Sequence, residues 1–184
     1  MAYDPEIHHR RSTRLKGFDY SSANAYFVTI CTEGREATLA DVEDGEVLVR
    51  EAGVVVHDEW GRLPQRFPGL GLDVFIVMPT HIHGILVLGY DPEALASSYG
   101  NDGTLPTLGQ VMRAFKSRSA VAANRALGRE GGAFWQCGFY DRVVRNDREL
   151  SNIRIYIQVN PANWLKDENN PDFLDRRPSR PDRP

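Results

Sequence analysis

The chain has 184 residues, a formal net charge of −3 at pH 7 and 41% hydrophobic residues, values that are typical of a soluble globular protein. At roughly 100–200 residues per domain, this length predicts a single domain. No run of about 18 apolar residues is present, which excludes a transmembrane helix. The polar start MAYDPEIHHRRSTR predicts no secretory signal, and two cysteines predict no disulfide framework, so we expect a cytoplasmic protein.

The charges are distributed unevenly along the chain. Residues 36–73 contain nine acidic and three basic side chains, a local charge of −6. Residues 107–148 contain eight basic and three acidic side chains, a local charge of +5. A local basic surface on an acidic protein is compatible with nucleic-acid binding, and a solvated helix face explains it equally well.

The first half of the chain predicts an arm, a strand, a turn and a helix. Residues 1–24 are polar and basic, and we expect an N-terminal arm. Residues 25–32 (AYFVTICT) are rich in aromatic and β-branched side chains, which favours a strand. The sequence DGE at 44–46 indicates a turn, and the apolar spacing over 50–66 indicates a helix that ends near Pro64 and Pro68.

The second half predicts two strands, a long helix, another strand and a last helix. The expected ranges are 72–77 and 82–88 for the two strands with Pro79 in the turn between them, 107–127 for the helix and 134–144 for the strand. We expect Asp147 to cap the last helix, which runs to about Val159. Residues 167–184 are rich in proline and charge, so we expect a disordered tail there.

This order of elements predicts the fold class. It matches a ferredoxin-like α+β sandwich over residues 25–166, with a mostly antiparallel sheet of four to five strands and helices on one face.

The most distinctive local pattern is His81-Ile82-His83. Residues i and i+2 of a strand point to the same face, so both imidazoles would converge while Ile82 packs into the other side. Two neutral imidazoles at this spacing provide half of a divalent-metal site. Histidines at this spacing also occur on ordinary exposed strands.

A second pattern places a phenol beside an amide. Tyr156 and Asn160 lie four residues apart and would share one helix face. Asn160 is a candidate oxygen ligand for a metal, or simply the cap of a helix that Pro161 ends. A tyrosine has an ordinary pKa near 10, so it needs help to act as a nucleophile, and a metal that polarises a phosphoryl oxygen supplies it. Attack would give a phosphotyrosine ester that a second strand end could reverse without ATP.

Several segments resemble REP-associated tyrosine transposases, the single-tyrosine HUH proteins related to insertion-sequence transposases of single-stranded DNA. Those segments, in the order of that family, are RRSTRLKGFDY (10–20), YFVTICT (26–32), VMPTHIHGI (77–85), AFKSRS (114–119), FWQCGFYDRVVRN (134–146) and YIQVNPANW (156–164). The resemblance covers roughly residues 8–166.

The resemblance implies a function and a set of roles. His81 and His83 match the metal-binding pair, Tyr156 matches the nucleophile, and Asn160 matches the position of a third, amide ligand. The family uses Mg²⁺ or Mn²⁺ to cut single-stranded DNA next to a palindromic hairpin, which leaves a 5′-phosphotyrosine and a free 3′-OH. Related transposases act as dimers, and either a monomer or a homodimer is open for this chain.

Eight further residues are candidate DNA contacts. They are Arg10, Arg11, Arg14 and Lys16 along a hairpin stem, Lys116 and Arg118 on the DNA backbone, Trp135 stacked on an unpaired base, and Arg145 on a phosphate. Each has a structural explanation as well. The four N-terminal cations could belong to a disordered tail, and Lys116 and Arg118 could be solvated charges. Trp135 could be a core aromatic, and Arg145 could form a surface ion pair.

Two other functions fit parts of the pattern. One is a single-stranded nucleic-acid-binding module without catalysis, in which the histidines and Tyr156 are incidental. The other is a zinc hydrolase with a water nucleophile, for which Asp141 and Glu149 are the nearby acids.

Overall fold

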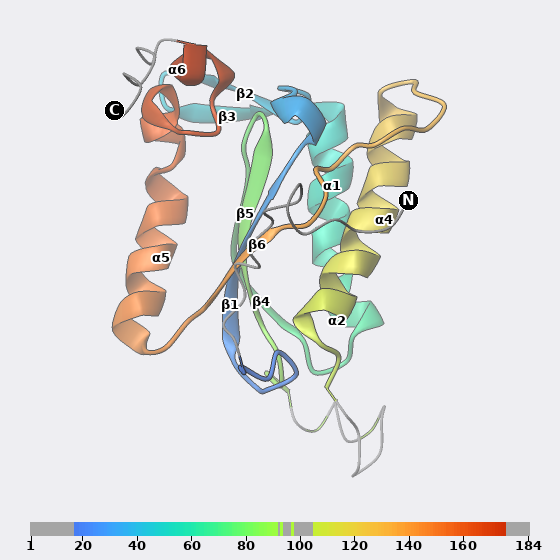
Figure 1. Ribbon diagram of the computed structural model, residues 1–184, viewed down its shortest axis with the longest axis vertical. Helices are drawn as coiled ribbons and strands as arrows, with labels where there is room; N and C mark the ends of the chain where they lie inside the picture. Colours follow the sequence, from blue (N-terminus) through green and yellow to red (C-terminus); the bar gives the residue numbers. More distant parts are fainter. Residues whose placement is uncertain (1–16, 92, 94–96, 98–104, 176–184) are drawn as a thin grey trace, which may run out of the picture.

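A computed structural model describes residues 17–91, 93, 97 and 105–175. Its centre is an antiparallel sheet with the order β4-β5-β1-β6 (Figure 1). The strands are β1 (Ala25–Cys31), β4 (Gly71–Val77), β5 (His81–Val87) and β6 (Tyr140–Val143). This order confirms the α+β class and the four-stranded antiparallel sheet.

The two central strands are apolar on both faces. In β1, Tyr26, Val28 and Ile30 enter one buried cluster, whereas Phe27 enters another on the opposite face. In β5, Ile82 and Leu86 alternate with Ile85 in the same way. Because successive side chains of a strand point to opposite faces, such a sheet needs helices on both sides.

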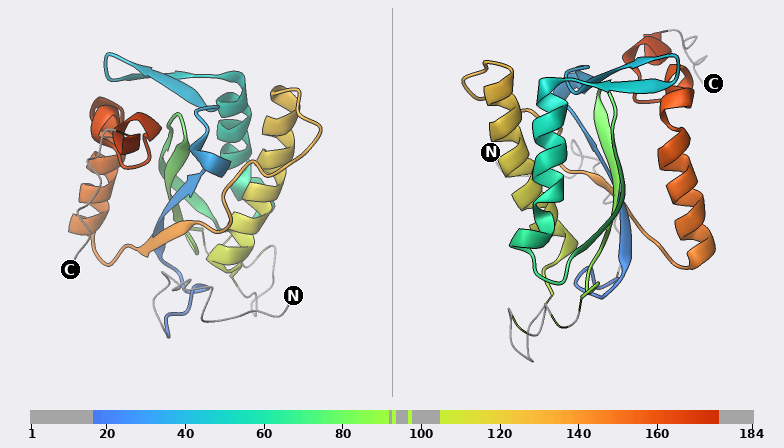
Figure 2. Two further views of the ribbon diagram at one scale, coloured as in Figure 1. Left: turned by 45° about the horizontal axis from the view of Figure 1, so that its top comes forward. Right: turned by 180° about the vertical axis from the view of Figure 1, so that it is seen from behind.

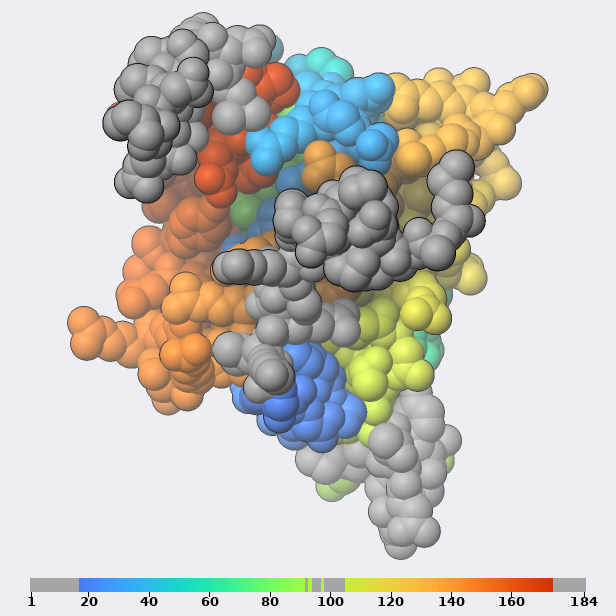
Figure 3. All heavy atoms as spheres, in the orientation of Figure 1, coloured from blue at the N-terminus to red at the C-terminus, as the bar shows by residue number. Residues whose placement is uncertain are grey.

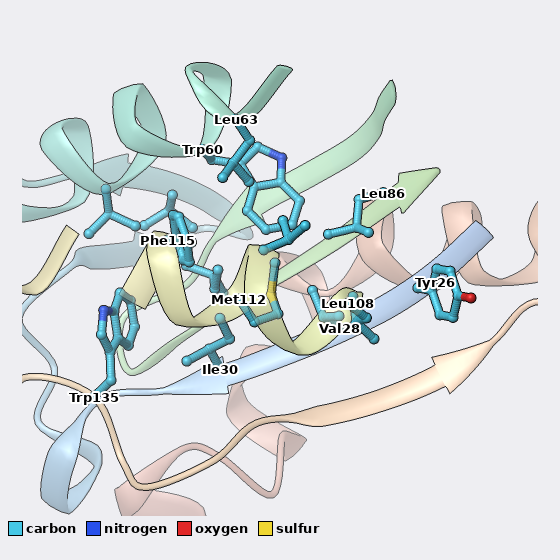
Figure 4. Close-up of a cluster of buried hydrophobic side chains, with 14 of the residues drawn as sticks. Tyr26, Val28, Ile30, Trp60, Leu63, Leu86, Leu108, Met112, Phe115 and Trp135 are labelled. Carbon is cyan, nitrogen blue, oxygen red and sulfur yellow. The ribbon is translucent and has the colours of Figure 1, made fainter. Parts of the chain in front are cut away.

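The larger cluster lies between the sheet and two helices, α1 (Glu51–Gly61) and α4 (Leu108–Ala126). Figure 4 shows Leu108, Met112 and Phe115 of α4 facing the side chains of β1. A capping box of Thr107 and Gln110 starts α4. The single helix expected over 50–66 is divided at Arg62 into α1 and the short helix α2 (Leu63–Arg66), which ends before Pro68.

The opposite face of the sheet is covered by α5 (Asp147–Val159) (Figure 2). Its buried residues Ile153 and Ile157 pack against Phe27 and Ile85. The expectation of helices on one face was therefore wrong, because the second apolar face also needs burial. The surfaces of α5 and α4 lie on opposite sides of the molecule (Figure 3).

Smaller elements connect these layers. The predicted turn at 44–46 joins β2 (Ala40–Glu43) to β3 (Glu46–Val49), and Asp44 and Gly45 both have positive φ there. The 3₁₀ segment η1 (Glu33–Arg35) follows β1. Within the described residues, no helix is both long and apolar enough to cross a membrane.

Both ends of the predicted domain fold further than expected. Phe18 and Tyr20, which we assigned to the arm, pack against the large cluster. After η2 (Pro161–Lys166), the chain continues into α6 (Pro171–Asp175), and Asn169 and Asn170 are buried. The disordered tail therefore does not begin at residue 167, and residues 176–184 lie outside the described part.

Two glycines of α1 should respond oppositely to alanine substitution. A Cβ at Gly53 would overlap the carbonyl oxygen of Leu39, whereas a Cβ at Gly61 would meet nothing within 4 Å. We expect Gly53→Ala to lower the free energy of unfolding by about 2 kcal/mol, because backbone must shift. Gly61→Ala should raise it by about 0.5–1 kcal/mol through helix propensity. Urea unfolding of both variants checks the pair, and a stabilised Gly53→Ala would contradict the tight contact.

Candidate metal and tyrosine site

The paired histidines stand at the start of β5. The turn from β4 closes with a hydrogen bond from the Met78 backbone nitrogen to the His81 carbonyl, so Pro79 lies in the turn as predicted. His81 and His83 are 0% and 2% exposed. Their Nε2 atoms lie 3.1 Å apart, which agrees with two side chains on one face of a strand.

Threonine hydroxyls orient both rings. The Thr80 hydroxyl donates to the carbonyl of Asn169 (2.9 Å) and lies 3.3 Å from Nδ1 of His81. Since a hydroxyl has one proton, Nδ1 of His81 is the donor of the second bond, which leaves its Nε2 with a free lone pair. The hydroxyl of Thr29 lies 2.8 Å from Nδ1 of His83 and allows the same arrangement there.

Burial keeps both imidazoles neutral. It lowers the pKa of His81 to about 3, with a further contribution from the positive charge of Arg35. Burial also lowers the pKa of His83 to about 3, with a contribution from His81. Each neutral imidazole carries one N–H, so the 3.1 Å contact between the two Nε2 atoms suits either a hydrogen bond between the rings or a cation held by both lone pairs.

This shift predicts the pH dependence of stability without metal. The folded-state pKa values of both histidines lie below the ordinary value of 6.5. Between about pH 3 and pH 6.5 the unfolded chain therefore binds more protons than the folded chain. The stability that the two neutral histidines contribute to the fold is complete above about pH 6.5 and is lost as the pH falls toward 3. Melting temperatures in chelator from pH 7.5 to 4.5 should fall less steeply for His81→Gln than for the exposed control His57→Gln. Equal slopes would contradict the shift.

Tyr156 reaches the histidines from α5. Its hydroxyl lies 3.4 Å from Nε2 of His83, and its ring contacts the rings of His83 and Phe27 edge-on. The side chain is half-exposed. Burial raises the pKa of Tyr156, and the carboxylates of Asp167 and Glu168 raise it further, so the phenol is protonated at neutral pH.

Asn160 lies one helical turn beyond Tyr156, at the end of α5. It is 3% exposed, and its Nδ2 donates to Oδ2 of Asp167 (3.1 Å). Its Oδ1 is buried with no hydrogen-bond partner among the described residues. A buried carbonyl oxygen without a donor is costly, and a cation is one way to satisfy it.

Sequence reasoning missed Asp167. Its carboxylate and the ring nitrogens of His81 and His83 lie within 4.8 Å of one another. An Asx turn holds it, because Oδ1 of Asp167 accepts from the backbone nitrogen (2.7 Å) and side chain (3.0 Å) of Asn169. The pattern Asp-x-Asn after η2 was the available signal. Asp141 and Glu149, considered for the zinc hydrolase, are not in this cluster.

These donors fit a divalent cation. Two ring nitrogens that each bind one ion at about 2.1 Å must lie within about 4 Å of each other, as the pair does. The carboxylate of Asp167 lies within 4.8 Å of both ring nitrogens and offers an oxygen ligand, and the buried oxygen of Asn160 is a candidate for a further one. His81, His83 and Asp167 therefore form a candidate metal centre.

The carboxylate of Asp167 should be needed for tight metal binding. Asp167→Asn keeps the size of the side chain and removes its charge, so we expect the affinity for Mn²⁺ to fall at least about tenfold. Glu168→Gln, one residue further on, is the matched control and should stay near the starting value. Titration calorimetry of both variants measures the effect, and equal affinities would remove Asp167 from the ligand set.

A groove of about 1230 Å³ opens beside Tyr156. Its floor is β1, with Phe27, Thr29 and Cys31, next to His83. One wall is α5 and the residues before it, including Arg145, Arg148, Asn152 and Tyr156. The other wall is the segment 136–140. The groove thus joins the candidate metal centre to three arginines, Arg142, Arg145 and Arg148.

The predicted DNA contacts fall in different places. Arg145 lines the groove, and its backbone nitrogen donates to Glu149. Trp135 is 6% exposed and donates to the Ser119 hydroxyl, so it is a core residue that cannot stack on a base.

The predicted backbone contacts on α4 have protein partners. Lys116 donates to two backbone carbonyls, and Arg118 contacts Glu59 on the helical face. Four further predicted contacts, Arg10, Arg11, Arg14 and Lys16, lie outside the described residues.

Comparison with known proteins places this chain in a family. No family model matches it. It is 31% identical to an uncharacterized protein of Haemophilus influenzae over 174 residues, which cover 90% of this chain and 96% of that protein. The chain belongs to the family of that protein.

Solved structures share its architecture. A REP-associated tyrosine transposase bound to a REP hairpin aligns over 83% of this chain and 76% of its own, with 18% identity and a TM-score of 0.54. This similarity establishes a transposase-like fold. A candidate transposase of Deinococcus radiodurans aligns over 79% of this chain and 95% of its own, with 20% identity and a TM-score of 0.47, too low to support a shared fold.

Proposed function

We propose that this protein is a metal-dependent endonuclease and strand transferase that cleaves single-stranded DNA near palindromic hairpins through a 5′-phosphotyrosine. The observation that carries the proposal is the Tyr156 hydroxyl, 3.4 Å from a buried pair of neutral histidines and open to a large groove. The fold shared with a hairpin-bound tyrosine transposase supports the same function.

In this proposal His81, His83 and Asp167 hold Mg²⁺ or Mn²⁺, with Asn160 as a further oxygen ligand. The ion supplies polarisation of a phosphoryl oxygen, which makes the phosphorus more electrophilic. The hydroxyl of Thr80 leaves the Nε2 lone pair of His81 available for it, and the hydroxyl of Thr29 allows the same at His83.

Tyr156 is the nucleophile. Its Oη forms a bond to the scissile phosphorus and releases its proton, while the bond to the 3′ oxygen breaks and that oxygen takes up a proton. The ring packing against Phe27 and His83 keeps the hydroxyl at the metal centre. A phosphate ester is kept throughout, so attack by a second 3′-OH can join strands without ATP.

Three arginines and three acidic side chains line the groove: Arg142, Arg145, Arg148, Asp141, Glu149 and Glu168. Arg142 is paired with Glu149, and Arg145 and Arg148 are the cations that we assign to the phosphates of the DNA. The wall with Arg145 and Arg148 and the wall with Phe139 and Tyr140 suit a strand whose phosphates and unpaired bases point in different directions. The proposed substrate is therefore single-stranded beside its hairpin.

The decisive test is a cleavage assay on a denaturing protein gel. Labelled single-stranded hairpin oligonucleotides from a randomised library are incubated with the protein in Mn²⁺ or Mg²⁺, or in chelator. We expect a labelled protein–DNA adduct that requires the metal. Binding without any adduct across the library would favour the non-catalytic binding module. Cleavage without an adduct would favour a hydrolase that uses water.

A further inference from the structure

The wall of the groove opposite Tyr156 contains a bulge. Thr29 of β1 pairs with Tyr140, and Thr32 forms a bridge with Trp135. Two residues separate the threonines, but four residues, 136–139, separate their partners. The two surplus residues cannot join the ladder, so the segment bends away from β1. Gly138, with a φ of +83°, lies within this bend.

One side chain, Lys116, donates to two backbone carbonyls of the bulge. Nζ of Lys116 donates to the carbonyls of Gln136 and Gly138, each at 2.6 Å. Carbonyls that leave a strand ladder need other donors, and a charged donor forms the stronger bonds. Lys116 comes from α4, on the face of the sheet opposite α5. The ammonium thus ties the bulge to the large helical layer.

The bulge and α5 together set the width of the groove. Residues 136–140 line one side, and α5 with Tyr156 lines the other. Trp135, just before the bulge, is fixed in the core by its bond to Ser119. The bulge itself is held by Gln136, whose backbone nitrogen donates to Cys31 (2.9 Å), and by Lys116. Lys116 holds the bulge but is not one of the described residues that line the groove.

We propose that Lys116 is a positioning residue for DNA binding: its ammonium holds the bulge 136–139 at the distance from α5 that admits a single strand, and it makes no phosphate contact of its own. This inference rests on the proposed function and differs from the sequence-based expectation, in which Lys116 contacts the DNA backbone. The two roles differ in how binding responds to salt.

The test measures affinity for a single-stranded hairpin oligonucleotide over a series of salt concentrations. A lost phosphate contact lowers the slope of log K against log [salt] by about 0.7 for a single strand. We expect Lys116→Met to bind about tenfold more weakly with an unchanged slope, because the wall moves while the phosphate contacts remain. The matched control is Arg148→Met on the opposite wall, which should lower the slope by about 0.7.

Two more variants separate positioning from general stability. Lys116→Arg should restore affinity, because a guanidinium also donates to two carbonyls. Gly138→Ala strains the left-handed position within the same bulge and changes no charge, so it should weaken binding with an unchanged slope. It keeps the inference testable if Lys116→Met fails to fold.

Three outcomes overturn the inference. A slope that falls in Lys116→Met as in Arg148→Met makes Lys116 a phosphate contact. Unchanged affinity in Lys116→Met and Gly138→Ala, with lower melting temperatures, makes its role structural only. Absence of single-strand binding by the unsubstituted protein overturns this inference together with the proposed function, whereas the first two outcomes leave that function intact.

Discussion

Tyr156→Phe should abolish the covalent protein–DNA adduct, with a loss of at least about 10³-fold in its rate of formation. Phenylalanine keeps the ring that packs edge-on against His83 and Phe27, so the fold and the groove remain. DNA affinity should stay within about twofold, because phosphate and base contacts dominate binding. Single-turnover reactions resolved on denaturing gels measure the rate.

Tyr140→Phe is the matched control for this experiment. Tyr140 is the other tyrosine that lines the groove, and it is 47% exposed. The proposed function predicts an adduct at the starting rate in this variant. An adduct that persists in Tyr156→Phe and disappears in Tyr140→Phe would move the nucleophile to β6 and reject the assignment of Tyr156.

His81→Ala and His83→Ala should each remove metal binding. Both side chains are buried and their Nε2 atoms face each other, so either truncation takes away one of the two nitrogen donors. We expect the affinity for Mn²⁺ to fall at least about 100-fold and adduct formation to fall with it. Calorimetric titration gives the affinity directly.

Thermal unfolding separates lost ligation from lost structure. Metal that binds only the folded state raises the melting temperature of the unsubstituted protein. The rise should vanish in His81→Ala and His83→Ala, whatever their melting temperatures without metal. His57→Ala, which replaces an exposed histidine of α1, should keep the full rise. A rise that survives in both buried variants would place the metal elsewhere.

Features that follow from local periodicity were predictable from the sequence. The period of two in a strand brought His81 and His83 to one face, and the helix period of 3.6 placed Tyr156 and Asn160 one turn apart. The end of α5 agrees with the predicted stop at Pro161, whereas its N-cap is Asn146, one residue before the expected cap Asp147. Each of these features depends on neighbours within a few residues.

Features that depend on tertiary contacts were not predictable. Asp167 reaches the histidines only because η2 folds the chain back toward the start of β5, and its proline-rich, polar surroundings are typical of a tail. Trp135 lies in a segment whose sequence suits either a core or a surface that stacks on bases. The hydrogen bond that its ring nitrogen donates to the Ser119 hydroxyl holds it in the core, and the sequence does not show this contact. The second helical face required knowing that both faces of β1 are buried.

The position of Asp167 in the chain sets the order in which the site is assembled during protein synthesis. Synthesis proceeds from the N terminus, so all four strands of the sheet and α5 are made before residue 167. A chain still attached to the ribosome can carry the histidines and Tyr156 while it lacks the carboxylate. The cluster of three ligands can therefore close only after residue 167 has been made, and until then the nascent protein carries a partial donor set.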